Sequence, residues 1–264
     1  MPAALGEYYP AALEAFDDWT APHAWALVWQ FPTPAQLPAA GQRRWEKFLH
    51  PHKLWRPETA PRRLEIFGQA AALPASTALT TAKRLLAVSL VKLLFTLQGQ
   101  LDQYRQQITP AFQRHPDYAV FGSLPGAKAI LGPRLLGGIG SVREEYPDAQ
   151  GLRCQAGVSP VSYQSGKVAK CRLRQACDKT LRATVHLWAN ASRSSCGWAQ
   201  AYYQHKRDEG QSHASALRCL GKRWLKILWR LWQDGEPYDE AHYLRQLEQR
   251  GSVTWKQLQA VPTV

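Results

Sequence analysis

A repeating apolar pattern between residues 76 and 110 constrains the fold of this chain more than any other feature. Apolar residues recur there at steps of three and four: Leu79, Ala82, Leu86, Leu90, Leu93, Leu94, Leu97, Leu101, Tyr104 and Ile108. This spacing predicts one long amphipathic helix that ends near Pro110. Ser76, Thr77 or Thr80 can cap its start. We expect the stripe to pack against neighbouring helices. A coiled-coil or dimer role is the lesser alternative, because the near-heptad spacing is imperfect.

Prolines limit the elements that come before this helix. A proline inside a helix costs about 3 kcal/mol, so helices in a proline-rich segment must be short. We expect four of them in residues 1–75, namely Pro10–Trp19, His23–Gln30, Gly41–Leu49 and Pro61–Gln69. Strand-type alternation is absent from residues 1–75. The fold class that we predict for the chain is mainly α, with at most a short β element.

The stretch Phe121–Val142 predicts a second kind of element. Pro125 and Gly126 open a short helix there, and Gly137, Gly138 and Gly140 close a tight turn. The free backbone N–H groups at a helix start bind phosphate without reading bases. This pattern is typical of a helix-hairpin-helix DNA-binding element, although glycine turns between helices are common.

The remaining elements follow from capping and periodicity. We predict helices over Pro147–Ala156, from the capping residue Asp178 to about Ser192, over Gly197–Arg207 and over Ser212–Trp232. Gly157–Lys167 is predicted as a loop and Val168–Arg174 as a short strand or an extended basic segment. The chain then divides into a helical spacer over 1–120, a second domain over 121–235 and a peripheral tail over 236–264.

Positive charge is concentrated in one part of the sequence. The net charge is +13 and the sequence pI is about 9.7. Between Gly151 and Gly235, 15 Lys and Arg face 4 Asp and Glu, a balance of 15 − 4 = +11. Such a surface favours polyanions, and we expect nucleic acid rather than membrane, because no apolar run approaches the roughly 20 residues that a spanning helix needs. The N-terminus has no secretory pattern, so we expect a cytoplasmic protein.

Five cysteines occur without CxxC spacing, and reduced thiols are the simplest interpretation. A zinc site from Cys171, Cys177 and His186 is conceivable, but no ligand pair has finger-like spacing. We therefore predict no metal held by this chain.

Ser165 lies directly ahead of the basic run. A serine hydroxyl attacks phosphorus poorly unless it is deprotonated and the phosphate charge is neutralised. Gly166 lets the backbone come close to a ligand, and the cations that follow can hold a phosphodiester: Lys167, Lys170, Arg172 and Arg174. The residues alone leave open that Ser165 merely occupies a glycine-containing turn.

A resemblance adds to this interpretation. The stretch from LPGAKAILGPRLLGGIGSVREEYPDAQGLRCQAGVSPVSYQSGK to RQACDKTLRATVHLWA resembles the C-terminal transposase domain of the IS one-ten class of bacterial insertion sequences. The shared pattern is a Leu-Pro-Gly helix-hairpin, a Gly-Ile-Gly turn, a Pro-Asp-Ala helix, an Ala-Gly-x-x-Pro step, a Ser-Gly-Lys loop and a basic helix. These elements occur in order across Leu124–Trp232, and the preceding residues resemble the helical spacer of the class.

The resemblance implies a function, a mechanism and partners. It implies a DNA transposase or recombinase in which a serine of the C-terminal domain forms a covalent link to DNA. Ser165 matches that serine, and Ser162 and Tyr163 are lesser candidates in the same loop. It also implies an RNA from the element itself as a guide, in addition to DNA. We predict these nucleic-acid contacts: Gly126, Lys128, Gly138, Gly140, Gly166, Lys167, Lys170, Arg172, Arg174, Lys179 and Arg182.

One part of the family pattern is missing. The class carries four acidic residues in a metal-binding RuvC-like domain that precedes the spacer, and this sequence begins inside the spacer. The sequence therefore resembles the C-terminal portion of a split or truncated transposase. We expect no cofactor on this chain, Mg²⁺ only through the missing acidic domain, and a homo-oligomer or a complementing acidic-domain polypeptide as partner.

Two other functions stay open at this stage. The chain can be a catalytically inactive remnant or accessory module that holds DNA or RNA through its basic face, with strongly salt-dependent affinity. It can also be a helical assembly scaffold that uses the helix over 76–110.

Overall fold

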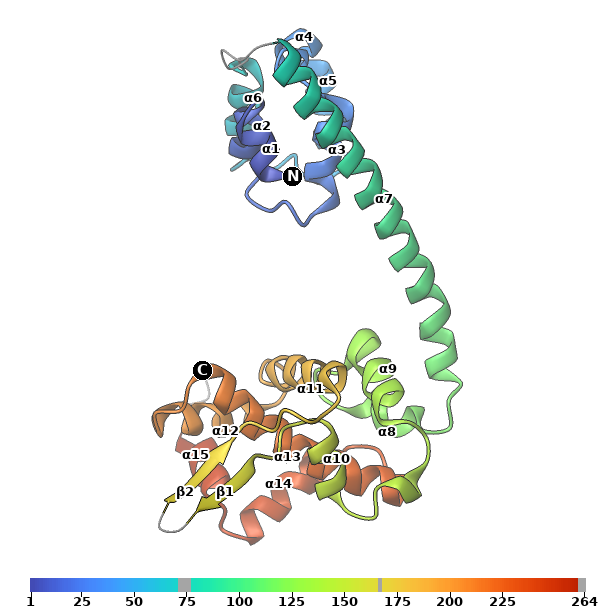
Figure 1. Ribbon diagram of the computed structural model, residues 1–264, viewed down its shortest axis with the longest axis vertical. Coiled ribbons are helices and arrows are strands. Elements are labelled where there is room, and N and C mark those ends of the chain that lie inside the picture. Colours follow the sequence, from blue (N-terminus) through green and yellow to red (C-terminus); the bar gives the residue numbers. More distant parts are fainter. Residues whose placement is uncertain (71–76, 166–167, 261–264) are drawn as a thin grey trace. The chain divides into compact units, whose positions relative to one another are not determined.

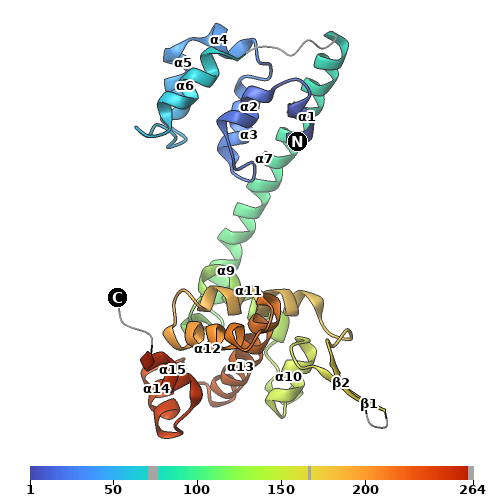
Figure 2. The same ribbon diagram turned by 90° about the vertical axis from the view of Figure 1, so that its left-hand side faces the viewer.

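The computed structural model describes residues 1–70, 77–165 and 168–260. The chain divides into two compact units, Met1–Arg105 and Gln106–Val264. The boundary falls inside the long helix α7 (Thr77–Gln113), whereas the sequence placed it at residue 120. The helix predicted over residues 76–110 is confirmed as α7, which ends at Gln113, three residues past the expected end at Pro110. The fold is mainly α, as predicted (Figures 1 and 2).

The first unit is built from short helices: α1 (Pro2–Gly6), α2 (Pro10–Ala15), α3 (Pro22–Gln30), α4 (Gln36–Ala40), α5 (Gln42–Leu49) and α6 (Ala60–Gly68). Pro10 and Pro22 each stand at the first position of a helix, where the missing N–H costs nothing. The core of the unit is aromatic, with Tyr9, Phe31 and Phe67 almost completely buried. The helix α2 ends at Ala15 rather than Trp19, because Phe16 is extended and turns into this core.

The second unit continues with α8 (Tyr118–Ser123), α9 (Lys128–Ile139), a 3-10 turn (Arg143–Glu145), α10 (Ala149–Gln155), α11 (Lys179–Ser192), α12 (Gly197–Asp208) and α13 (His213–Asp234). Four tryptophans are fully buried at its centre: Trp188, Trp198, Trp224 and Trp232. The predicted cap of α11 is present, because the Asp178 carboxylate accepts from the N–H groups of Thr180 and Leu181 at 2.7 and 2.9 Å. That cap fixes where α11 begins.

The last residues form α14 (Glu240–Gln249) and α15 (Val253–Ala260). We expected a peripheral tail here, but Leu247 is 5% exposed and lies in the core of the second unit. The Arg223 guanidinium donates to the Thr254 hydroxyl at 2.8 Å, which ties α13 to α15. The polar composition of the tail concealed the few apolar residues that pack inward.

The only sheet among the described residues is a β hairpin. Strand β1 (Val161–Ser165) pairs antiparallel with β2 (Val168–Arg172), with Val161 opposite Arg172 and Ser165 opposite Val168. Val161–Ser165 was expected to be loop; its alternation of Val161 and Tyr163 with polar residues suits an exposed strand. In the part of the chain that the structure describes, no helix is long and apolar enough to cross a membrane.

Candidate nucleic-acid interface

The hairpin presents Ser165 to solvent. All five residues of β1 are exposed, and Ser165 is the last of them, next to the connection between the strands. Gly166 and Lys167, two of the predicted contacts, lie outside the described residues. Figures 1 and 2 show the hairpin extending from the body of the second unit. The serine is thus open to a large ligand.

Alternation along the strands decides which residues share a face with Ser165. Tyr163 and Ser165 lie on one face, and Ser162 lies on the other. The Arg172 guanidinium stands over the Tyr163 ring, 5.7 Å from its centroid, so Arg172 also belongs to the Ser165 face. Lys170 pairs with Tyr163 in the ladder, but its side chain is not described.

An arginine cluster anchors the base of the hairpin. An Arg182 nitrogen donates to the Arg174 carbonyl oxygen and to the Cys177 sulfur, the latter at 2.6 Å. Gly157 has φ +63, and a Cβ there would come within 2.6 Å of the Arg182 guanidinium. Only glycine lets the chain pass this close. The Nε atoms of Arg174 and Arg182 are buried without a hydrogen-bond partner.

A basic groove of about 350 Å³ opens beside Arg182, between α11 and α13. Its floor is apolar, with Val158, Val185 and Leu217, and its charged residues are all cationic or titratable to a cation: Lys179, Arg182, His186 and Arg218. Burial, with His213 and Arg218 nearby, lowers the pKa of His186 below its usual 6.5. A groove with four basic groups and no carboxylate in its lining attracts phosphate.

The glycines of the predicted helix-hairpin have other surroundings. Gly126 has φ +76, and a Cβ there would lie 2.6 Å from the Ser192 backbone nitrogen at the end of α11. Gly138 lies against the Leu181 side chain, where a Cβ would come within 3.0 Å. Both glycines therefore let α9 pack closely on α11. Gly140 has φ +86 and open space around it at the end of α9.

The predicted contacts thus separate into two groups. Ser165, Arg172, Arg174, Lys179 and Arg182 lie on the hairpin or in the groove at its base. Gly126, Lys128, Gly138 and Gly140 belong to the turn before α9 and to α9 itself, and both ribbon views place the α8–α9 pair apart from the hairpin. The Lys128 side chain is outside what the structure describes. Contact of any of these residues with nucleic acid stays a prediction.

Sequence reasoning missed His186 and Arg218 as groove residues. A signal for His186 was available, because residues 179, 182 and 186 recur at helical spacing and share one face of α11. Arg218 is on α13, and only the packing of α13 against α11 brings it to the same groove. Among the described residues, no group of three or more His, Cys, Asp or Glu is placed to hold a metal ion.

Comparison with known proteins agrees with the resemblance found in the sequence. Residues 118–204 match the model of the Transposase IS116/IS110/IS902 family. The chain is 30% identical over 243 residues to the mini-circle protein of IS117 from Streptomyces coelicolor, covering 89% of this chain and 58% of that protein.

Two further relatives agree. An uncharacterized 42 kDa protein of the insertion element IS900 from Mycobacterium paratuberculosis is 28% identical, over 88% of this chain and 58% of its own length. An uncharacterized 44.8 kDa protein of IS116 from Streptomyces clavuligerus is 27% identical, over 85% and 56%. The chain therefore spans somewhat more than half the length of the curated relatives it matches.

Proposed function

We propose that this chain is a member of the Transposase IS116/IS110/IS902 family, whose model matches residues 118–204, and that it acts on DNA during transposition of an insertion element. In this proposal Ser165 is the nucleophile. The observation that carries the proposal is the exposed position of Ser165 on the hairpin face that also bears Tyr163 and Arg172. In this role the hairpin delivers the hydroxyl to the DNA backbone. The α11–α13 groove holds neighbouring phosphates.

The chemical step needs more than the serine. The Ser165 oxygen forms a bond to phosphorus, a bridging P–O bond of the DNA backbone breaks, and the leaving DNA oxygen takes up a proton. A base must accept the serine proton, and positive charge must stabilise the phosphorane-like transition state. In this proposal Arg172, on the same face as Ser165, supplies part of that charge. We propose that a metal-binding acidic domain, bound to this chain or supplied by another polypeptide, provides Mg²⁺ and the remaining groups.

Replacing the serine tests this proposal. We expect Ser165→Ala to abolish a denaturation-resistant protein–DNA adduct, because no oxygen nucleophile remains at that position, while DNA affinity stays within about twofold. The assay supplies element-end DNA, magnesium and the acidic domain of a relative, and it detects the adduct by its shifted mobility on a denaturing gel. Ser162→Ala is the matched control, since Ser162 lies on the opposite face of the same strand.

The outcomes separate two functions. If wild-type protein forms no adduct under these conditions, or if Ser165→Ala forms as much as wild type, the nucleophile proposal is wrong. Binding without an adduct supports the second candidate, a module that holds nucleic acid through the carboxylate-free groove. That candidate requires affinity to fall by orders of magnitude between low and moderate salt.

We also propose two partners beyond DNA. An RNA of the element is one, because the family resemblance implies a guide and the basic segment offers a surface for it. A second copy of the chain is the other. The apolar stripe of α7 supports it, since Leu93, Leu97 and Tyr104 are 60%, 54% and 63% exposed.

A further inference from the structure

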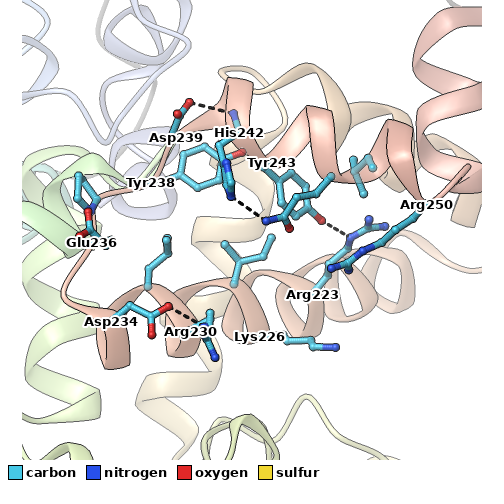
Figure 3. A pocket seen from close by; sticks show the side chains of 15 residues that line it. Arg223, Lys226, Arg230, Asp234, Glu236, Tyr238, Asp239, His242, Tyr243 and Arg250 are labelled. Atoms are coloured by element: carbon cyan, nitrogen blue, oxygen red, sulfur yellow. Dashed lines mark hydrogen bonds and ion pairs between the residues drawn. The ribbon is translucent and has the colours of Figure 1, made fainter.

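A second groove, larger than the one beside the hairpin, lies between α13 and α14 (Figure 3). Its volume is about 990 Å³, and its middle is lined by apolar side chains, among them Ile227, Leu231 and Leu247. Tyr238 and Tyr243 form part of the same wall. Neither the proposed chemistry at Ser165 nor the basic groove at α11 uses this surface.

Charge in this groove is arranged along its length. Arg223, Lys226 and Arg250 gather toward one end, and Asp234, Glu236 and Asp239 lie toward the other, with Arg230 paired to Asp234 at 2.6 Å (Figure 3). One end therefore attracts an anion. The other end accepts hydrogen bonds from neutral or cationic donors.

The three basic residues at the cationic end of the groove differ in the contacts that they already make. The Arg223 side chain already donates to the Tyr243 hydroxyl and the Thr254 hydroxyl, both at 2.8 Å, and stands over the Tyr202 ring at 4.8 Å. Arg223 thereby holds α14 and α15 against α13 at this wall of the groove. Lys226 and Arg250 are exposed and have no ion-paired or hydrogen-bonded side-chain partner among the described residues. These two side chains can therefore bind an anion without first breaking another interaction.

We propose that this α13–α14 groove binds an unpaired nucleic-acid strand, with phosphate on Lys226 and Arg250 and base amino groups toward Glu236 and Asp239. A nucleotide combines an anionic phosphate, a flat apolar ring and an edge that, in cytosine, adenine and guanine, carries an amino donor. Those three parts match the cationic end, the apolar and aromatic middle and the acidic end. In a duplex the pairing edges of the bases are occupied, so recognition of this kind selects single strands.

The dimensions of the groove agree with a short segment. From Arg223 to Asp234 the helix α13 rises about 16.5 Å, so one nucleotide lying lengthwise can have its phosphate at the cationic end and its base edge at the acidic end, with side chains reaching toward it from both ends. Carboxylates accept a hydrogen bond from the cytosine amino group, whereas thymine has no amino group to donate. The inference deepens the proposed function and rests on it, because it names a single strand as a second nucleic-acid partner of the same domain.

Short labelled oligonucleotides test this inference on the full chain. We expect fluorescence anisotropy to show that wild-type protein binds a six-nucleotide oligo-dC more tightly than oligo-dT. The K226A/R250A variant should bind oligo-dC about tenfold more weakly, with a salt slope smaller by about 1.4, because two phosphate contacts at about 0.7 each are lost. K222A/R245A is the matched control, since it removes the same charges from the same two helices outside the groove.

The base-reading end has its own variant. Glu236→Gln should remove the preference for oligo-dC over oligo-dT, because a carboxylate only accepts, whereas the glutamine amide can accept from the cytosine amino group and can equally donate to a thymine carbonyl. Glu236 is exposed and lies beyond the end of α13, so the fold should survive the change. Ribo-oligo-C in place of oligo-dC shows whether the strand is RNA or DNA: the tighter ligand identifies the source.

Several results would overturn the inference. The inference is wrong if wild type and K226A/R250A bind oligo-dC equally. That result is expected if the groove holds a peptide or a second copy of the chain. Equal affinity of wild type for oligo-dC and oligo-dT would also reject it. Duplex DNA binding, tested with K179A/R218A, reports separately on the α11–α13 groove, so the inference can fail while the proposed function stands.

Discussion

At the scale of single residues, the second unit depends on one buried charge. Asp117 is 4% exposed, and its carboxylate accepts from the Arg143 guanidinium and from the Trp232 indole N–H, the latter at 3.1 Å. Arg143 also donates to the Trp232 carbonyl oxygen at 2.7 Å. This network ties the start of α8 to the end of α13. Removing the carboxylate would leave the guanidinium and the indole without their acceptor.

We expect Asp117→Ala to lower the free energy of unfolding by about 1–3 kcal/mol, because the buried Trp232 indole N–H loses its acceptor, whereas the Arg143 side chain is 35% exposed and can be hydrated. Urea unfolding followed by tryptophan fluorescence measures this loss. Asp234→Ala is the control: its pair with Arg230 is exposed, so its loss should cost at most about 1 kcal/mol. Equal effects of the two substitutions would contradict the assigned role of Asp117.

His186 predicts how binding in the α11–α13 groove depends on pH. Its pKa is lowered by burial, and His213 and Arg218 on α13 disfavour its charged form further. Lys179 and Arg182 add like charge from α11 itself. In the free protein His186 is therefore neutral at pH 7. A phosphate in the groove stabilises the imidazolium and raises this pKa, so binding takes up a proton.

DNA affinity should accordingly rise as the pH falls from 7 through 6, by at most about tenfold per pH unit for one proton. The same histidine lowers the stability of the free fold over that range, because the unfolded chain binds the proton more readily than the folded one. Anisotropy titrations at several pH values measure the binding effect. We expect His186→Gln to flatten the profile and His205→Gln, outside the groove, to leave it unchanged; a profile that His186→Gln does not alter would contradict this.

At the scale of elements, α7 and the β hairpin both carry exposed surface that a partner could cover. A two-stranded hairpin with both faces in water is marginal by itself. Val91 of α7 is buried in the core of the first unit, but one face of the helix carries exposed apolar residues: Leu86, Leu93, Leu97, Leu101, Tyr104 and Ile108. A second copy of α7 would cover such a stripe as a coiled coil.

We expect light scattering to give the mass of a dimer for the wild-type chain at micromolar concentration. The double substitution Leu93→Glu with Leu97→Glu should yield a monomer, because two carboxylates per helix would be placed in the apolar seam. Gln103→Glu with Gln106→Glu adds the same charge on the opposite side of the helix and should leave the dimer intact. A monomeric wild type would count against the oligomer.

At the scale of the whole molecule, two separate hydrophobic cores stabilise the chain. One contains Leu27, with the aromatic residues of the first unit, and the other contains Leu220, with the four buried tryptophans. Contacts are dense within Met1–Arg105 and within Gln106–Val264. Each unit therefore has its own cooperative source of stability, and a single unfolding transition is not required.

Matched core truncations test this independence. Leu27 and Leu220 are both completely buried, so each Leu→Ala change should cost about 2–5 kcal/mol. We expect Leu27→Ala to shift only the transition of the first unit and Leu220→Ala only that of the second, as followed by hydrogen exchange of each unit. A shift of both units by either substitution would show that they unfold together.

The sequence by itself determined the features that depend on neighbours along the chain. The apolar steps of three and four predicted α7, and Asp178 marked the start of α11, because helix formation and capping involve residues only a few positions apart. Prolines predicted short helices in the first unit for the same reason. The order of the motifs over Leu124–Trp232 also predicted the resemblance to the family whose model matches residues 118–204.

Tertiary structure alone decided which surfaces those elements form. Gly126 faces the end of α11, and Arg218 joins His186 in one groove, because residues distant in sequence meet only when helices pack. The groove with Lys226 and Arg250 exists because α14 folds back beside α13, although its polar sequence predicted a peripheral tail. Long-range packing energy, which no local pattern encodes, determines these contacts.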